Sequence, residues 1–152
     1  MVSREACVAQ VGAWRAEGRT VVFTNGVFDL LHAGHVRYLA TARAEGDRLI
    51  VAVNADATVR AAKGADRPVH PAEERAELVA ALQVVDLVTI FSEATPAALI
   101  EAVQPDVLVK GADWPLDQVV GRETVWARGG RVVRVPTEVG HSTTGIIGKI
   151  RK

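Results

Sequence analysis

The chain has 152 residues, of which 49% are hydrophobic and 24% are charged, and its 18 basic side chains are balanced by 18 acidic ones. This length suits one folded domain, and a chain of ~150 residues buries roughly 68–70% of the surface that it exposes when unfolded, so we expect a single domain over residues 1–152. The composition excludes disordered, collagen-like and fibrous proteins, and a net charge of +0 argues against nucleic acid or an anionic membrane as a partner, because these need a broad basic face.

Cys7 is the one cysteine of the sequence, so the chain cannot form an internal disulfide or a cysteine-rich zinc site. The first residues lack the apolar segment of a secretory signal, and apolar runs such as residues 49–53 are far shorter than the ~18 residues of a membrane span. We therefore expect a cytoplasmic protein.

Short runs rich in valine and isoleucine alternate along the chain with alanine-rich segments of helical spacing. We predict a first helix from its cap Ser3 to Gly18, and then, in chain order, a strand at 20–24, a helix at 35–46, a strand at 48–53, a helix at 71–82, a strand at 87–91, a helix at 96–103, a strand at 107–110, a helix at 121–128, a strand at 131–135 and a helix at 143–150. Strands that are apolar along their whole length belong to a parallel sheet covered on both faces. The predicted fold is an α/β three-layer sandwich with a five-stranded parallel sheet.

Ligands of such sheets bind beyond the carboxyl ends of the strands, which here are followed by residues 25–34, 54–71, 111–120 and 136–142. The first of these loops leads through Asn25-Gly26 to His32 and His35, with Gly34 between the two histidines. Glycine lets a ligand approach the backbone closely, and the next helix directs its free N–H groups and its positive end at the same space. The loop therefore predicts an anion site, in which imidazoles donate hydrogen bonds to phosphate oxygens.

The two histidines can also be half of a zinc site or a chance pair at a helix start. Zinc needs three or four ligands, and the other histidines, His70 and His141, have no motif spacing with Cys7 or with the carboxylates. The sequence also lacks the P-loop and the dinucleotide-binding glycine motif. The residues around the histidines decide between these interpretations.

The segment from Asn25 to Leu39 resembles the signature of the cytidylyltransferase-like nucleotidyltransferases, in which a Gly-x-Phe-Asp precedes a His-x-Gly-His. Similarity continues through residues 52–56, 63–64, 67–69, 74–77, 105–113 and 142–144, where the chain looks like the adenylyltransferase domain of bacterial ADP-heptose synthases. The resemblance implies a Rossmann-like nucleotidyltransferase fold. That domain is often fused to a sugar kinase, and this sequence contains none, which implies the stand-alone form.

The resemblance implies transfer of AMP from ATP to a sugar 1-phosphate, with D-glycero-β-D-manno-heptose 1-phosphate as the expected acceptor and ADP-heptose and pyrophosphate as products. Mg²⁺ would arrive with ATP, without direct protein ligands, and a separate sugar kinase and phosphatase would act upstream. Relatives commonly form homodimers, which is one assembly open to this chain.

Two alternatives remain: a cytidylyltransferase that uses CTP with a phosphonate or an alcohol phosphate such as glycerol 3-phosphate, and a nucleotide-binding module without turnover. The glycerol 3-phosphate branch carries an arginine where this chain has Thr137, which speaks against that acceptor.

The same resemblance divides the candidate site residues into three sets. We expect the catalytic set to be His32, His35 and Lys63, the nucleotide-binding set to be Asn25, Gly26, Phe28, Gly34, Lys110, Gly111, Asp113, Trp114, Ser142 and Thr143, and the substrate-binding set to be Asp29, Asn54, Arg67 and Arg75.

Several of these residues also have a simpler interpretation. Lys110 can be an exposed turn lysine, Trp114 a packed loop anchor, and Ser142 a plain helix cap. Asp29 can brace its loop, and Arg75 can form a surface ion pair with Glu73, Glu74 or Glu77. The sequence leaves His141 without a role.

Overall fold

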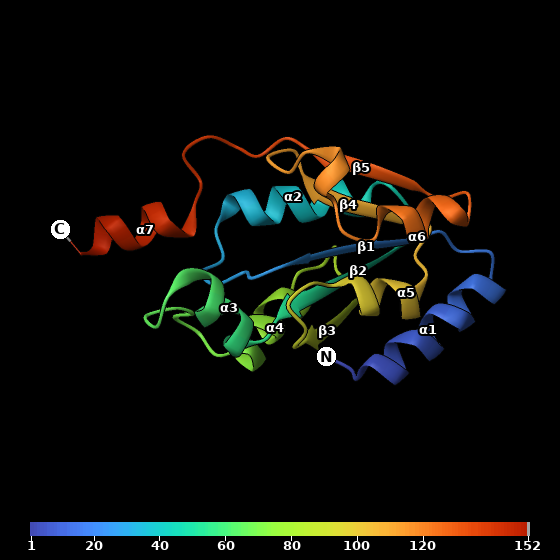
Figure 1. Ribbon diagram of the computed structural model, residues 1–152, viewed down its shortest axis with the longest axis horizontal. Helices are drawn as coiled ribbons and strands as arrows, with labels where there is room; N and C mark the ends of the chain where they lie inside the picture. Colours follow the sequence, from blue (N-terminus) through green and yellow to red (C-terminus); the bar gives the residue numbers. More distant parts are fainter. Residues whose placement is uncertain (152) are drawn as a thin grey trace.

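The computed structural model, which describes residues 1–151, contains a five-stranded parallel sheet with helices on both faces (Figure 1). The strands are β1 (Val21–Gly26), β2 (Arg48–Asn54), β3 (Leu87–Phe91), β4 (Val107–Gly111) and β5 (Arg131–Val135), in the spatial order β3-β2-β1-β4-β5. All four neighbouring pairs are parallel, which confirms the predicted sheet. The chain runs outward from β1 to β3 and then returns to β4 on the other side of β1, so the strand order reverses between β1 and β4.

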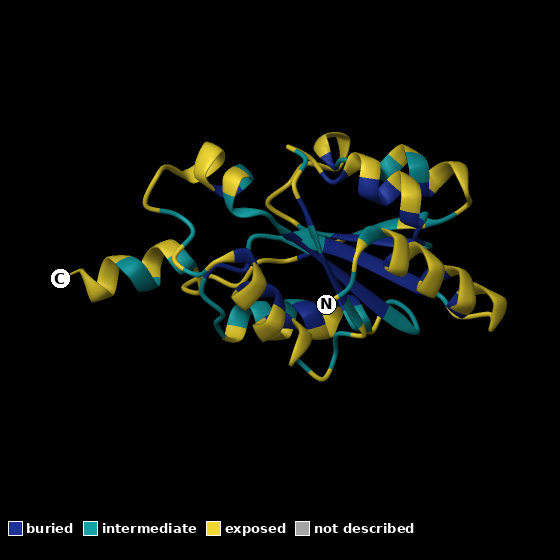
Figure 2. Ribbon diagram, turned by 90° about the horizontal axis from the view of Figure 1, so that it is seen from below, coloured by how far each residue is buried: buried dark blue, intermediate teal, exposed yellow. Residues whose placement is uncertain are grey.

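The helices form the two outer layers of the predicted sandwich. On one face, α1 (Arg4–Ala16), α5 (Ala97–Val103) and α6 (Arg122–Ala127) contribute buried side chains to one hydrophobic core. On the other face, α2 (Ala33–Arg43) and α4 (Ala72–Ala80) contribute to a second core. Figure 2 shows the strands as the buried centre between helices whose outer faces are exposed.

The central strands are buried on both sides, which explains their unbroken apolar sequences. In β1, Phe23 packs into the first core and Val22 into the second, and in β2 the residues Leu49 to Val53 have no exposed surface. Because successive side chains of a strand point to opposite faces, each apolar run supplies both cores at once.

The structure departs from the predicted elements between the strands. The helix expected at His35 begins at Ala33, because the His32 side chain caps it. Residues 54–71, expected to be a loop, contain helix α3 (Asp56–Lys63), and a 3₁₀ helix spans Leu116–Gln118. Helix α3 has only eight residues and buries only Val59, so it is shorter than the ~11–18-residue window over which helical periodicity can be recognised.

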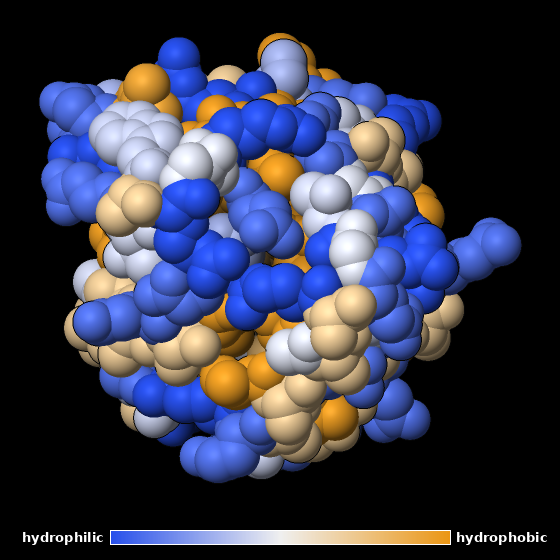
Figure 3. Space-filling view, turned by 90° about the vertical axis from the view of Figure 1, so that its right-hand side faces the viewer, coloured by the Kyte–Doolittle hydropathy of each residue, from blue (hydrophilic) through white to orange (hydrophobic). Residues whose placement is uncertain are grey.

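The last helix, α7 (Thr143–Ile150), has no buried residue and extends away from the sheet beside the carboxyl ends of the strands (Figure 1). Within residues 1–151, none of the helices combines the length and the apolar character needed to cross a membrane. The opposite end of the molecule, where the strands begin, presents mostly hydrophilic side chains with scattered apolar ones (Figure 3).

Candidate active site

A cavity of about 670 Å³ opens at the carboxyl ends of the strands, where the strand order reverses. The ends of four strands reach it, through Asn25 and Gly26 of β1, Asn54 of β2, Lys110 and Gly111 of β4, and Val135 of β5. This volume is in the range of small-molecule sites, ~300–1,000 Å³. All the residues predicted to be catalytic or nucleotide-binding line the cavity, and so does Asn54, whereas Asp29, Arg67 and Arg75 do not.

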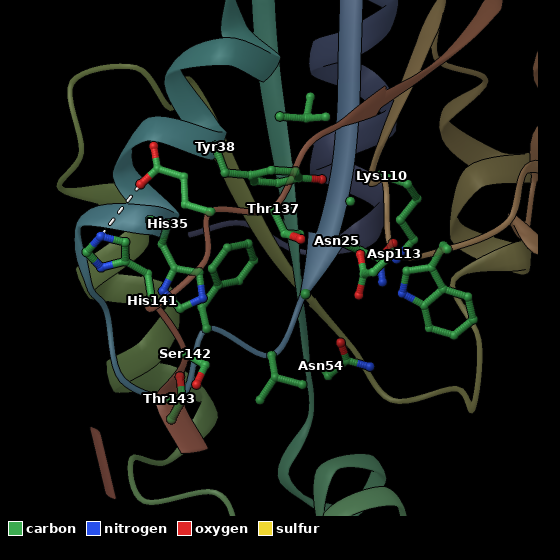
Figure 4. Close-up of a pocket in the computed structure, with 18 of the residues that line it drawn as sticks. Asn25, His35, Tyr38, Asn54, Lys110, Asp113, Thr137, His141, Ser142 and Thr143 are labelled. Carbon is green, nitrogen blue, oxygen red and sulfur yellow. Dashed lines mark ion pairs between the residues drawn. The ribbon is translucent and has the colours of Figure 1, made fainter. Parts of the chain in front are cut away.

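The side chains form two groups that face one another across the cavity (Figure 4). Lys110, in β4, and Asp113, just after this strand, lie on one side. His35, His141, Ser142 and Thr143 lie on the other, where α2 and α7 begin. The two helix N-termini direct unsatisfied N–H groups toward this second side, which suits it to bind anions.

The two histidines of the motif are stacked at the start of α2. Their ring centres are 3.8 Å apart with an interplanar angle of 19°, and His35 also lies against Phe28, with ring centres 5.3 Å apart. Nδ1 of His32 accepts a hydrogen bond from the backbone N–H of His35 over 3.3 Å. In the neutral ring the proton is then on Nε2, which can donate to a ligand oxygen.

The environment keeps both imidazoles neutral near pH 7 in the free protein. Burial lowers the pKa of His35 to about 4, and positive charge on His32, when that ring is protonated, and on Lys63 acts in the same direction. The pKa of His32 is also lowered, by burial and by His141. A phosphate would oppose these effects, because a negative charge favours the protonated ring.

Two residues of the cavity wall, His35 and Asn25, hold a side-chain polar atom out of solvent. Nδ1 of His35 and Oδ1 of Asn25 are buried without a hydrogen-bond partner within residues 1–151. Buried polar atoms in native proteins nearly always have a partner. Within residues 1–151, this feature sets His35 and Asn25 apart from the other residues of the cavity wall.

The opposite side of the cavity presents an aromatic face. Trp114 is 47% exposed, so it is not a packed anchor, and Nζ of Lys110 lies 5.6 Å from the centre of its ring. Burial lowers the pKa of Lys110, while the charge of Asp113 opposes this shift. Gly111 leaves room for Asp113, because a Cβ there would lie 2.5 Å from an oxygen of that carboxylate. An exposed indole beside a cation suits the stacking of a planar base.

The start of α7 is tied to the histidine loop. Oγ of Ser142 accepts a hydrogen bond from Gly145 N–H over 3.0 Å, so the predicted cap is present. Thr143 Oγ1 donates to the Leu30 carbonyl over 3.3 Å. Lys63 ends α3 at the cavity, with an exposed side chain followed by Gly64 at a φ of 98°.

Asp29 and Arg67 brace the loops behind the cavity wall. Asp29 is 2% exposed and accepts hydrogen bonds from Arg67 and from the backbone N–H of Val69, the latter over 2.7 Å. Burial opposes its ionisation, yet the hydrogen bonds from Arg67, Val69 and His70 lower its pKa. The structure thus supports the interpretation of Asp29 as a loop brace.

Arg75 has no exposed surface and pairs with Asp56, which contradicts the alternative of a surface ion pair with a neighbouring glutamate. Its guanidinium donates to the carbonyls of Val27, Asn54 and His70 over 2.6, 2.8 and 2.9 Å, and to the Asp56 carboxylate over 2.6 Å. These acceptors belong to three separate segments at the site: the loop after β1, the end of β2 with the start of α3, and the turn before α4. Arg75 therefore holds the cavity wall in place and offers no surface to a substrate.

Sequence reasoning did not single out several polar residues that line the cavity, among them Arg37, Tyr38 and Glu138, and it left His141 without a role. Tyr38 Oη and Thr24 Oγ1 are 2.9 Å apart, and burial raises the pKa of Tyr38 to about 12, so it remains a neutral phenol. Arg37 and Tyr38 follow His35 on the first turns of α2, which is the one sequence signal that could have found them.

The contacts of Gly34 predict that an alanine at this position lowers activity. A Cβ there would lie 2.9 Å from Cβ of His141 and 3.0 Å from the His32 ring, so both side chains must shift by a few tenths of an ångström. We expect Gly34→Ala to lower kcat by about tenfold, because misplaced catalytic groups cost rate steeply. Steady-state kinetics checks this, with Gly12→Ala in α1 as the matched control, since a Cβ at Gly12 meets nothing within 4 Å. Equal activity of the two variants would contradict the role of this contact.

The chain is similar to known proteins over its whole length. The family model described as "Cytidylyltransferase-like" matches residues 23–149. The chain is 52% identical over 151 residues to "Bifunctional protein HldE" of Mesorhizobium japonicum, and 53% identical over 152 residues to the protein of the same name from Klebsiella pneumoniae subsp. pneumoniae. These alignments cover 99% and 100% of this chain but 30% and 32% of the relatives, so the chain spans about a third of their length.

Solved structures agree with the sequence comparison. The "lipopolysaccharide core biosynthesis protein" from Thermoplasma volcanium is 30% identical, with a TM-score of 0.65 over 80% of this chain and 98% of that one. A protein from Archaeoglobus fulgidus, 22% identical with a TM-score of 0.62, shares the fold. The family match covers the strand ends, both histidines and the start of α7, and the chain belongs to the cytidylyltransferase-like family of nucleotidyltransferases.

Proposed function

We propose that the chain is an adenylyltransferase that joins ATP and a sugar 1-phosphate, with D-glycero-β-D-manno-heptose 1-phosphate as the acceptor, to give ADP-heptose and pyrophosphate. The observation that carries the proposal is the stacked pair of His32 and His35, which lies at the start of α2 and lines the cavity. The name of the Thermoplasma volcanium relative refers to lipopolysaccharide core biosynthesis, and an activated sugar is a fitting product.

In the proposed reaction, an oxygen of the sugar phosphate attacks the α-phosphorus of ATP and forms the new P–O bond. The bond to the β-phosphate breaks in line with this attack, and pyrophosphate leaves with the electron pair. A phosphate monoester is already anionic near neutral pH, so no side-chain nucleophile or base is needed. Catalysis then consists of positioning the two substrates and stabilising the charge that grows on the phosphate oxygens.

The two sides of the cavity suit the two ends of ATP. Trp114 and Lys110 would hold the base, while His32 and His35 would donate hydrogen bonds to the α-phosphate in the transition state. The N–H groups and hydroxyls at the start of α7 would bind the leaving pyrophosphate, and the exposed Lys63 would neutralise phosphates of both substrates.

The residues at the site offer Mg²⁺ little direct ligation. No group of three or more histidine, cysteine, aspartate or glutamate side chains within residues 1–151 is placed to hold a metal. Asp29 is buried and hydrogen-bonded to Arg67, which leaves it unsuited to a metal. Mg²⁺ commonly binds through substrate phosphates and waters. We therefore propose that Mg²⁺ enters with ATP and neutralises phosphate charge, held by the phosphate oxygens.

A panel of substrates tests the proposed function. Purified protein is incubated with ATP or CTP and with heptose 1-phosphate or glycerol 3-phosphate, and pyrophosphate release is measured. We expect release with ATP and heptose 1-phosphate to exceed every other pair by at least about tenfold, because a site that hydrogen-bonds its substrates discriminates against analogues that leave those groups unpaired. Thr137 lines the cavity where the glycerol 3-phosphate branch has an arginine, which also disfavours that acceptor. Preference for CTP, or ATP binding without release, would replace the proposal with one of its two alternatives.

A further inference from the structure

An ion-paired cluster of three residues lies on the α2 side of the cavity. Nη1 of Arg37 in α2 is 2.5 Å from Oε2 of Glu138, which belongs to the loop between β5 and α7. The same carboxylate oxygen is 3.6 Å from Nε2 of His141, the contact drawn in Figure 4. All three residues line the cavity, and the proposed reaction uses none of them.

In this cluster the Glu138 carboxylate lies between the guanidinium of Arg37 and the imidazole of His141, and both of these groups can bind a phosphate as well as a carboxylate. A guanidinium forms paired hydrogen bonds with carboxylates and phosphates alike, and an imidazole ring can donate to either. The side chains of Arg37, Glu138 and His141 are 60%, 41% and 38% exposed. Exposed ion pairs contribute little stability, so a ligand with more negative charge can displace this carboxylate at small cost.

The position of His141 connects the cluster to the histidine pair. Its ring lies 6.0 Å from the ring of His32 with an interplanar angle of 27°, so three imidazoles stand in a row along one side of the cavity. His141 also precedes Ser142, the cap of α7. A phosphate group held by Arg37 and His141 would therefore lie next to the groups proposed to act on the reacting phosphates.

We propose that Arg37 and His141 form a further subsite for a terminal phosphate group of a substrate, and that Glu138 occupies this subsite until the phosphate arrives. The identity of the substrate rests on the proposed function: the phosphate is that of the sugar acceptor or the terminal one of ATP. The two sources share the chemistry of an anion with several oxygen acceptors, and the experiment separates them.

The subsite can be tested with inorganic phosphate as the probe, without any turnover. The ring resonance of His141, identified by its loss in His141→Asn, is followed by NMR during a phosphate titration. We expect Arg37→Gln to weaken phosphate binding by about tenfold, as for the loss of a charge-assisted hydrogen bond. Glu138→Gln should strengthen it by up to about fivefold, because the competing carboxylate is gone. Opposite signs for these two variants would support the subsite, whereas weaker or unchanged binding in Glu138→Gln would overturn it.

A second ion pair between the same parts of the fold provides the matched control. Arg131, at the start of β5, pairs over 2.6 Å with Glu45, which lies just after the end of α2. Neither residue lines the cavity. Glu45→Gln should leave phosphate binding unchanged. A shift in Glu45→Gln equal to that in Glu138→Gln would mean a general charge effect and would overturn the proposal.

Steady-state kinetics then identifies the source of the phosphate. A rise of about tenfold in KM for the sugar phosphate in Arg37→Gln would assign the subsite to the acceptor, and the same rise in KM for ATP would assign it to the terminal phosphate of the nucleotide. An unchanged KM for both would overturn the subsite. Failure of the proposed function is separate, because it would appear as absent pyrophosphate release in the wild-type protein while the phosphate titration still gave its own answer.

Discussion

Replacement of His35 by alanine is expected to lower kcat by about two to three orders of magnitude, which is the usual cost of losing one preorganised donor at a reacting phosphate. The ring is held between His32 and Phe28, and its buried Nδ1 has no partner within residues 1–151. The pKa near 4 means that the ring is neutral when substrate arrives, so it contributes a positioned N–H donor. The negative charge of a bound phosphate then favours the protonated form of the ring. Pyrophosphate release under saturating substrates measures the effect.

His70 supplies the control for this experiment. It lies outside the cavity, and its Nδ1 is 3.1 Å from the Glu74 carboxylate. His70→Ala should keep kcat within about twofold of the wild-type value, because surface substitutions away from a site have small effects. Circular dichroism shows whether each variant is folded. A folded His35→Ala variant with undiminished turnover would remove His35 from the mechanism.

The sequence predicted the sheet because its strands are buried on both faces. Val21 to Phe23 and Leu49 to Val53 are continuous apolar runs, and short runs of this kind are typical of a covered parallel sheet. The loop from Asn25 to His35 was equally informative, because its glycines, histidines and helix start all favour an anion site. The cavity confirms that this loop, Lys110 and Ser142 come together in space.

Long-range contacts of polar residues escaped the sequence analysis. The local sequence does not indicate that Arg75 is buried and donates to the carbonyls of distant segments. It also does not indicate that Glu138 pairs with Arg37, which is more than one hundred residues away in the chain. Such contacts depend on how the loops fold over the ends of the strands. Helix α3 was missed for a different reason, since a helix of eight residues with one buried side chain offers too short a pattern to recognise.

The balance of 18 basic and 18 acidic residues does not extend to the cavity. Its charged lining within residues 1–151 consists of Arg37, Lys63 and Lys110 against Asp113 and Glu138, together with three imidazoles and two helix N-termini. If phosphate displaces Glu138 as proposed, one of the two carboxylates that line the cavity moves away from the side where α2 and α7 begin. In the free protein Glu138 would offset the charge of Arg37, and a bound phosphate would take the place of that carboxylate.

Arg75→Ala is expected to lower the free energy of unfolding by about 3–5 kcal/mol, the typical cost of removing one partner from a buried charged network. The guanidinium joins Val27 in the histidine loop, Asn54 at the end of β2, and His70 before α4. Without it, three carbonyls lose their donor and the Asp56 carboxylate loses its cation. Urea unfolding measures the loss, and Arg60→Ala in α3, whose side chain is exposed, should change stability by less than about 0.5 kcal/mol.

Arg75→Lys separates positioning from charge. An ammonium keeps the charge but carries its three donors on one atom. It therefore cannot replace the planar guanidinium, which reaches acceptors on three separate segments. We therefore expect the lysine variant to remain folded at 25 °C with kcat reduced by about tenfold, because Val27 and Asn54 line the cavity and would move. The KM for ATP should change less than kcat, since Arg75 has no surface of its own in the site. A lysine variant with full activity would show that the cavity wall keeps its shape without the guanidinium, and Arg75 would then contribute to folding alone.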